Sequence, residues 1–245
     1  MILLLALLAF QAASAQPVRV VRGINGTWEA YPQRGAGLGS TSQAAVPAPA
    51  PMPEPPLKPD FLAKWKEEQA RNAERTRQGL PPVTSGMACL PEGMPGMMQG
   101  TFPLEVLETP GQVTIIEEAF NQVRRIYLDE KPIAPADAEP FFSGHSFGVW
   151  EGNTLVVQTV GVKDYVRLRN TPHSMNMRIT ERIRLINDDF MENQITIEDP
   201  EFLTKPWTWT WMYKRWKGYK IQEYVCEDNR YYVDPAQNYQ RLRVQ

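Results

Sequence analysis

The side chains best suited to chemistry in this chain are its two histidines and the residues spaced beside them. His173 opens the run "HSMNM", in which Met175 and Met177 follow at every second position. Side chains alternate between the two faces of a β-strand, so this spacing predicts a row of one imidazole and two thioethers. Both groups suit copper(I), and Met97 and Met98 of "GMPGMM" would add two more thioethers.

The same row is equally typical of a barrel interior. If residues 173–186 form one strand, a single face carries His173, Met175, Met177, Ile179, Glu181, Ile183 and Leu185. Interior methionines ordinarily fill gaps between other side chains, and those of "GMPGMM" would then close the barrel mouth. We therefore expect no cofactor, with copper as the alternative.

A carboxylate on that inward face, Glu181, must be paired, hydrogen-bonded or raised in pKa. The segment "QVRRIYL" offers Arg125 as its partner. Such a pair is either a structural brace or a general acid or base in a cavity. Because Glu181 lies roughly 26 Å beyond His173 along an extended strand, the two cannot line one compact site. We assign the catalytic role to His173 with His145, which sit beside long loops, and the brace to Glu181 with Arg125.

Three tryptophans, Trp207, Trp209 and Trp211, share one face of "KPWTWTW". Such a row either fills a core or lines a pocket for an apolar or aromatic molecule. Core filling is the simpler interpretation for any one of them, and three side by side favour a barrel wide enough to hold a ligand.

The elements that would position these side chains are mainly β. Short strand patterns lie near 101–108, 111–119, 122–128, 145–150, 153–160, 173–186, 190–198, 207–215 and 219–226. Turn residues such as Pro110-Gly111 and Gly152-Asn153 separate them. About nine sequential hairpin-linked strands predict an antiparallel up-and-down barrel, with a β-sandwich as the alternative.

The segments before the barrel differ from it in composition. Residues 1–15 have the apolar run and Ala-Ser-Ala end of a signal peptide, although no Lys or Arg precedes the run. The predicted order is then a short strand segment at 16–34, a disordered Pro/Ala/Gly-rich linker at 35–59, a helix at 60–79, the barrel at 80–230 and a tail at 231–245. The helix has apolar residues only near its start, so we expect it to dock by one end.

Export also bears on the two cysteines, Cys89 and Cys226. In an exported protein such a pair most often forms a disulfide; two free thiols or soft-metal ligands are the alternatives. A formal net charge of −2 argues against a nucleic-acid partner. The only long apolar run is far shorter than the roughly 20 residues that span a bilayer, so we expect a periplasmic or secreted protein.

Several motifs together resemble a known family. The runs "CLPEGMPGMM", "LETPGQVTIIEEAFNQVRRIYLD", "GHSFGVWEGNTLVVQTVG", "PHSMNMRITERIRL", "DPEFLTKPWT" and "EYVCEDN" are similar to those of a family of secreted proteobacterial and acidobacterial proteins. The resemblance implies a periplasmic β-rich domain with GHS and PHS segments. This chain departs from it at Met175, where the family often has an acidic residue, and at Glu130, where it has glycine. "GTW" at 26–28 and "GVW" at 148–150 also resemble the strand starts of lipocalin-type barrels.

Three hypotheses about function follow. The first is an exported lipocalin-like barrel that binds a small apolar or aromatic molecule, with His145, His173, Arg125 and Glu181 around one end. Such a protein would be a carrier, or an acid–base enzyme such as a lyase, isomerase or hydrolase. The second is a copper(I) or other soft-metal binder. The third is a structural envelope protein without a ligand. The chain has no P-loop, G-x-G-x-x-G, H-E-x-x-H or G-x-S-x-G motif.

Overall fold

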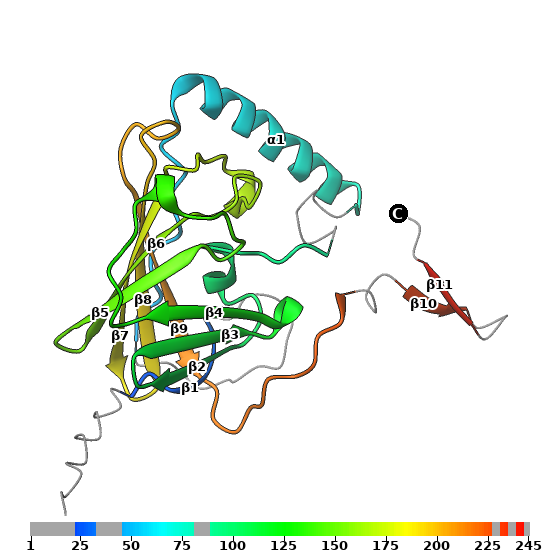
Figure 1. Cartoon of the computed structure of the whole chain (residues 1–245). Coiled ribbons are helices and arrows are strands. Elements are labelled where there is room, and N and C mark those ends of the chain that lie inside the picture. The colour runs from blue at the N-terminus through cyan, green and yellow to red at the C-terminus, as the bar shows by residue number, and fades with distance from the viewer. Residues whose placement is uncertain (1–22, 33–45, 81–88, 227–230, 235–238, 243–245) are drawn as a thin grey trace, which may run out of the picture.

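Nine strands wrap into a closed barrel in chain order (Figure 1). The computed structural model describes residues 23–32, 46–80, 89–226, 231–234 and 239–242. The barrel strands are β1 (Gly26–Tyr31), β2 (Leu104–Thr109), β3 (Gln112–Glu117), β4 (Gln122–Tyr127), β5 (His145–Glu151), β6 (Thr154–Val160), β7 (Arg178–Asn187), β8 (Phe190–Glu198) and β9 (Trp207–Arg215). β1 pairs with β9 and closes the barrel. The predicted mainly β barrel with one α-helix is confirmed.

Shorter elements complete the chain. Within the described residues, four 3₁₀ turns are η2 (Gly96–Gln99), η3 (Ala119–Asn121), η4 (Pro135–Asp137) and η5 (Leu168–Asn170). Strands β10 (Tyr231–Asp234) and β11 (Tyr239–Leu242) pair only with each other, in a separate two-stranded sheet. The predicted signal peptide lies outside the described residues.

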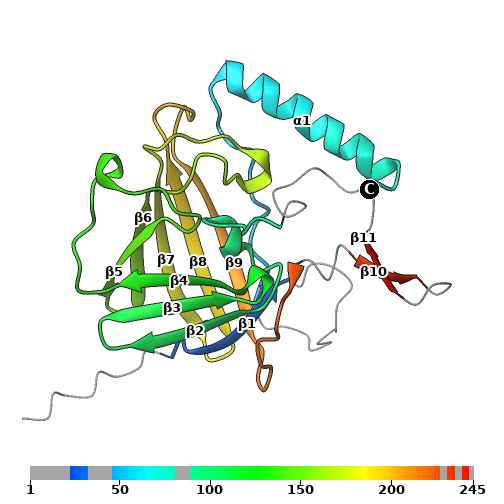
Figure 2. The same cartoon turned by 45° about the vertical axis from the view of Figure 1, so that its right-hand side comes forward.

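One seam of the barrel departs from the predicted up-and-down pattern. β4 and β5 run parallel, with Ile126 opposite Ser146 and Tyr127 opposite Phe147, whereas the other neighbouring strands are antiparallel. Parallel neighbours need a crossover, and residues 128–144 provide it. In Figure 2, β2, β3 and β4 run at a steep angle to β6–β9. This seam is therefore the place where strand pairing contributes least to closure.

The set of barrel strands also differs from the prediction at the two ends of the chain. β1 was expected to be a separate N-terminal segment, but it lies between β2 and β9 as a full member of the barrel. The strand expected at 219–226 does not form. β1 already occupies the free edge of β9, so residues 219–226 have no strand to pair with.

The proline-rich segment expected to be disordered over 35–59 is ordered in its second part. Residues 46–58, here called the strap, lie extended against the barrel, while 35–45 fall outside the described residues. Leu57 is 3% exposed and bridges to Leu203. Trp207 Nε1 donates to the Pro53 carbonyl at 3.1 Å, and Tyr31 Oη donates to the Val46 carbonyl at 2.8 Å. A proline-rich chain has free carbonyls and little conformational entropy to lose, which explains why it can dock.

Helix α1 (Pro59–Arg77) follows the strap directly and docks by its first turns, as predicted. Proline at its first position suits a helix start, where the missing N–H has no partner in any case. Trp65 is buried, and its Nε1 donates to the Arg169 carbonyl at 3.0 Å. The Phe61 ring packs on Phe202 with 4.3 Å between centroids. Figure 1 shows the rest of α1 extending away from the barrel.

Residues 92–99, here called the plug, fill one mouth of the barrel. Met94, Met97 and Met98 have no exposed surface. Tyr213 Oη donates to the Met98 carbonyl, and the Met94 amide donates to the Phe142 carbonyl at 2.9 Å. These methionines fill gaps in the interior, as the gap-filling interpretation of "GMPGMM" predicts.

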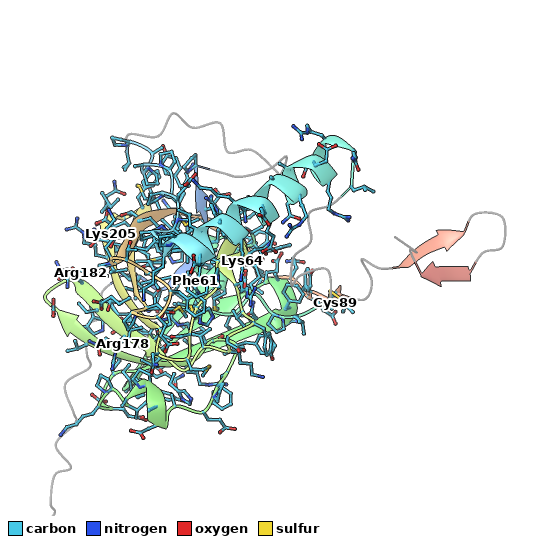
Figure 3. The ribbon with its side chains drawn as sticks, turned by 90° about the horizontal axis from the view of Figure 1, so that it is seen from above. Phe61, Lys64, Cys89, Arg178, Arg182 and Lys205 are labelled. Carbon is cyan, nitrogen blue, oxygen red and sulfur yellow. A yellow bond between two sulfur atoms is a disulfide. The ribbon has the colours of Figure 1, made fainter. Side chains whose placement is uncertain are left out.

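Cys89 and Cys226 form a disulfide with Cα atoms 5.7 Å apart, as predicted (Figure 3). Because residues 219–226 are not a strand, the bond ties the segment that enters the plug to the segment that leaves the barrel. Within the described ranges, no helix combines the length and the apolarity needed to cross a bilayer.

The strap should contribute measurably to stability. Leu57→Ala removes a buried side chain and should lower the free energy of unfolding in urea by about 2–4 kcal/mol. Leu80→Ala is the matched control, because Leu80 is 46% exposed and follows the helix; it should change stability by less than about 0.5 kcal/mol. Equal effects of the two substitutions would mean that the strap does not pack in solution.

Candidate functional site

The row predicted from His173 to Met177 does not form, because β7 begins only at Arg178. Ser174 turns the chain instead. Its amide and hydroxyl donate to the Asp199 carboxylate at 2.6 and 3.0 Å, and its carbonyl accepts from the Met177 amide at 3.2 Å. Such local side-chain hydrogen bonds compete with strand pairing. The segment therefore becomes part of the loops at one end of the barrel.

From Arg178 onward the predicted alternation holds, and Glu181 points inward with no exposed surface. Arg124 forms an ion pair with it, with Nη1 donating to Glu181 Oε1 at 3.2 Å. Arg124 also donates to Ser146 Oγ at 3.0 Å and to Thr159 Oγ1 at 2.9 Å. Asn193 Nδ2 donates to Glu181 Oε1 at 2.8 Å. These five residues, the Arg124 cluster, come from five successive strands, β4 to β8.

The predicted pairing of Glu181 with Arg125 is wrong. β4 turns Arg124 inward, where it is 1% exposed, and leaves Arg125 in solvent beside Val123, which is 42% exposed. The segment carries one arginine on each face, so alternation alone does not select between them. Both carboxylate oxygens of Glu181 and all three guanidinium nitrogens of Arg124 are engaged. This arrangement fits the predicted brace better than an acid–base site.

A second buried carboxyl lies beside the plug and has no clear signal in the sequence. Glu117 has no exposed surface, and its Oε2 accepts a hydrogen bond from Gln122 Nε2 at 2.6 Å. Gln122 Oε1 in turn accepts from the Gly93 amide at 2.9 Å. Burial, with a smaller contribution from the nearby Glu92 charge, raises the pKa of Glu117 to about 9. Burial also raises the pKa of Glu92 to about 7. At neutral pH the Glu117 carboxyl is therefore protonated, and Gln122 links it to the backbone of the plug.

His145 lies on the outer face at the start of β5, next to the inward-facing Ser146. Its Nε2 contacts the Glu139 carbonyl at 2.8 Å, and its ring packs against Phe141 with 4.8 Å between centroids. The pocket beside His173 does not include His145. The structure therefore does not bring the two histidines together in one pocket.

His173 lines a small cavity at the end of the barrel, here called the end pocket. The cavity measures about 20 Å³, enough for one water molecule or one small group. Its walls are mostly apolar, formed by Pro95, Val166, Leu168, Pro172, Met177, Ile197, Leu203 and Trp207, with Thr171, His173 and Asp199 as the polar members. The ring nitrogens of His173 lie 2.8 Å from the Val166 carbonyl and 2.9 Å from the Ser174 carbonyl. A neutral imidazole carries one N–H, so His173 donates to one of these two carbonyls.

Thr171 is the residue of this pocket that sequence reasoning missed. It is 7% exposed, and its hydroxyl has no hydrogen-bond partner among the described residues. A buried hydroxyl without a partner costs free energy, and so it indicates a place where another molecule could bind. No sequence pattern distinguishes this threonine from the others.

An open groove of about 770 Å³, here called the end groove, adjoins the end pocket. Asp199 and Leu203 line both, so the two spaces are adjacent. The groove lies between η4, the start of β7 and residues 198–206, and its charged members include Arg178, Glu198 and Lys205. Figure 3 looks down on this end of the molecule and labels Arg178 and Lys205. Its volume is typical of small-molecule sites.

The three predicted tryptophans are packed together inside the barrel. Trp207, Trp209 and Trp211 are each less than 5% exposed, and neighbouring rings lie 4.6 and 5.3 Å apart between centroids. Only Trp207 reaches the end pocket. The row fills the interior, and a ligand there would have to displace core side chains.

The soft-metal hypothesis gains no specific support from the geometry. Met97 Sδ accepts a hydrogen bond from Ser143 Oγ at 3.7 Å, and Met175 is only half buried, outside the expected row. Among the described residues, no three His, Cys, Asp or Glu side chains gather as a metal site would need. Copper binding through thioethers stays a prediction.

The Arg124 cluster should be a brace that fails when one partner is removed. Glu181→Ala leaves a buried guanidinium without its carboxylate and should lower the free energy of unfolding by about 3–5 kcal/mol. Arg184 and Glu192 form a more exposed ion pair on the outer face, and Glu192→Ala should cost less than about 1 kcal/mol. Urea unfolding of both variants measures the difference; a Glu181→Ala protein as stable as Glu192→Ala would contradict the brace.

The carboxyl of Glu117 should make stability fall as pH rises. The folded state keeps a proton that the unfolded chain releases above pH 4.5, so its contribution is complete below pH 4.5 and is lost as pH rises to about 9. Glu117→Gln mimics the protonated form and should flatten the fall in unfolding free energy between pH 5 and 8.5. Each proton accounts for up to about 1.4 kcal/mol per pH unit. Glu130→Gln, on the surface, is the control, and an unchanged slope in Glu117→Gln would refute the assignment.

Comparison of the chain with protein-family models finds no match, and comparison with functionally curated proteins finds none either.

Proposed function

We propose that this protein is an exported binding protein for a small, largely apolar molecule, which lies in the end groove and inserts one group into the end pocket. The observation that carries the proposal is the hydroxyl of Thr171, buried without a partner in a cavity that is otherwise mostly apolar. Sites for small molecules commonly combine an apolar lining with a few polar groups that fix orientation.

The proposal places the ligand at the end of the barrel because buried side chains pack the part of the interior that the structure describes. The tryptophan row and the plug methionines are buried against one another, and the Arg124 cluster occupies the middle. The end pocket alone admits only a group of water or methyl size. The adjoining groove of about 770 Å³ supplies the volume for the rest of a ligand.

Export to an oxidising compartment is part of the same proposal. The bond between Cys89 and Cys226 supports it, because structural disulfides persist mainly outside the cytosol. The apolar run at 2–10 with Ala13-Ser14-Ala15 after it is the sequence feature in its favour. The periplasm or the medium is the location we propose.

The methyl group of Met177 provides a direct test, because it lines the end pocket. With [methyl-¹³C]methionine labelling, titration with 1-hexanol, toluene or n-hexane should shift the Met177 signal. The signals of Met52 in the strap and Met98 in the plug should stay in place. Leu168→Phe, which narrows the pocket from η5, should abolish the shift while the melting temperature shows that the protein remains folded.

A Met177 signal that does not respond to any of these probes would contradict the proposal. A response of Met98 alone would instead place the ligand inside the barrel.

A further inference from the structure

The polar groups of the end pocket differ in whether they still have hydrogen-bonding capacity. Both ring nitrogens of His173 already face backbone carbonyls. The Asp199 carboxylate accepts from the amide and hydroxyl of Ser174 and from the amides of Glu201 and Phe202. Among the polar side chains that line the pocket, Thr171 alone has no partner within the described part of the chain. The pocket thus offers one open hydrogen-bonding position, a hydroxyl that can donate or accept.

A single open position does not suit a trapped water. Buried water typically makes about three hydrogen bonds and is held by otherwise unsatisfied polar groups. Here a water would find one such group and face mainly Val166, Leu168, Met177 and other apolar side chains. A ligand group with one polar atom and an apolar body meets both requirements, since the hydroxyl binds its polar atom and the walls bury its carbon atoms.

Charge narrows the ligand class further. A carboxylate entering the pocket would lose its hydration and approach the Asp199 carboxylate, which carries the same charge. An ammonium would be attracted to Asp199, but it would lose its hydration and bring three donors to a pocket in which Asp199 already accepts four hydrogen bonds and one hydroxyl is open. The end groove carries charges of both signs, with Arg178 and Lys205 as cations and Glu198 as an anion. It therefore favours neither an anionic nor a cationic ligand.

We infer that the group bound in the end pocket is uncharged and bears a single oxygen, a hydroxyl or a carbonyl at the tip of a slender apolar chain that continues into the end groove, with Thr171 as the residue that selects it. This inference rests on the proposed function, and it adds the chemical class of the ligand and the specificity-determining residue.

Four probes of the same shape test the class, with binding followed by the Met177 methyl signal at pH 7. They are 1-hexanol, n-hexane, hexanoate and hexylammonium. We expect 1-hexanol to bind most tightly of the four. Thr171→Val keeps the shape of the side chain and removes the hydroxyl. It should therefore lower the affinity for 1-hexanol by about 3- to 10-fold, the range of one hydrogen bond, and leave the affinity for n-hexane unchanged.

Thr180→Val on β7 is the matched control and should leave all four affinities unchanged. Thr171→Val should also remain as stable as the parent, because the hydroxyl that it removes has no partner among the described residues. Equal binding of 1-hexanol and n-hexane, or an unchanged 1-hexanol affinity in Thr171→Val, would overturn the inference and leave the proposed function intact. Tighter binding of hexanoate or hexylammonium than of 1-hexanol would also overturn the inference and leave the proposed function intact. No response to any probe would overturn both, with a structural water as the occupant.

Discussion

The ion pair between Arg124 and Glu181 is the interaction on which the barrel most depends. Strand pairing is weakest between β4 and β5, where only two residue pairs are in register. Arg124 crosses this seam from the inside and reaches Ser146 on β5, Thr159 on β6 and Glu181 on β7. Side-chain hydrogen bonds thus supply the cross-links that the short backbone ladder does not. The desolvation cost of two buried charges is offset only because each is hydrogen-bonded from several sides.

A barrel braced through its centre has little space left for a ligand. The tryptophan row, Tyr213 and the plug methionines fill what remains around the ion pair. Loops at the end of the barrel are then the natural place for a binding site, because a rigid scaffold positions them without imposing its own packing on them. The end pocket is built in this way, from the plug, residues 166–177 and residues 197–207.

The plug links the interior to this end site. Pro95 lines the end pocket. Just before it in the chain, the Gly93 amide donates to the Gln122 side chain of the wall, and the Glu92 charge adds to the burial that raises the pKa of Glu117. Burial raises the pKa of Glu117 to about 9, so this carboxyl is neutral at pH 7 where Gln122 connects it to the plug. The strap and helix α1 approach the same end from outside, through Leu57 and Leu203 and through Trp65 and Arg169.

Local periodicity in the sequence was enough to predict the barrel. The alternation of apolar side chains along each strand, and the turn residues between strands, depend only on residues close together in the sequence. The inward position of Glu181 and the docking end of the helix were predicted in the same way. The disulfide was predicted from the number of cysteines and the expected compartment instead. What failed were choices of strand pairing and of facing residue, which depend on distant partners. Which of Arg124 and Arg125 faces inward depends on how β4 pairs with its neighbours in the closed barrel, and that pairing turns Arg124 inward. β1 rather than residues 219–226 completes the barrel because it pairs with β2 as well as β9.

The site itself was decided by tertiary structure. The spacing of His173, Met175 and Met177 is that of a strand, yet hydrogen bonds from Ser174 to Asp199, 25 residues away, turn the chain before the strand begins. The same contacts bring Thr171 and His173 against Trp207 and Leu203. The sequence by itself determined the compartment we propose, the architecture and the polar residue buried at its centre, because these follow from local composition and period. Tertiary structure decided which arginine meets that residue, where the cavity lies and which hydroxyl lacks a partner, because each depends on contacts between distant segments.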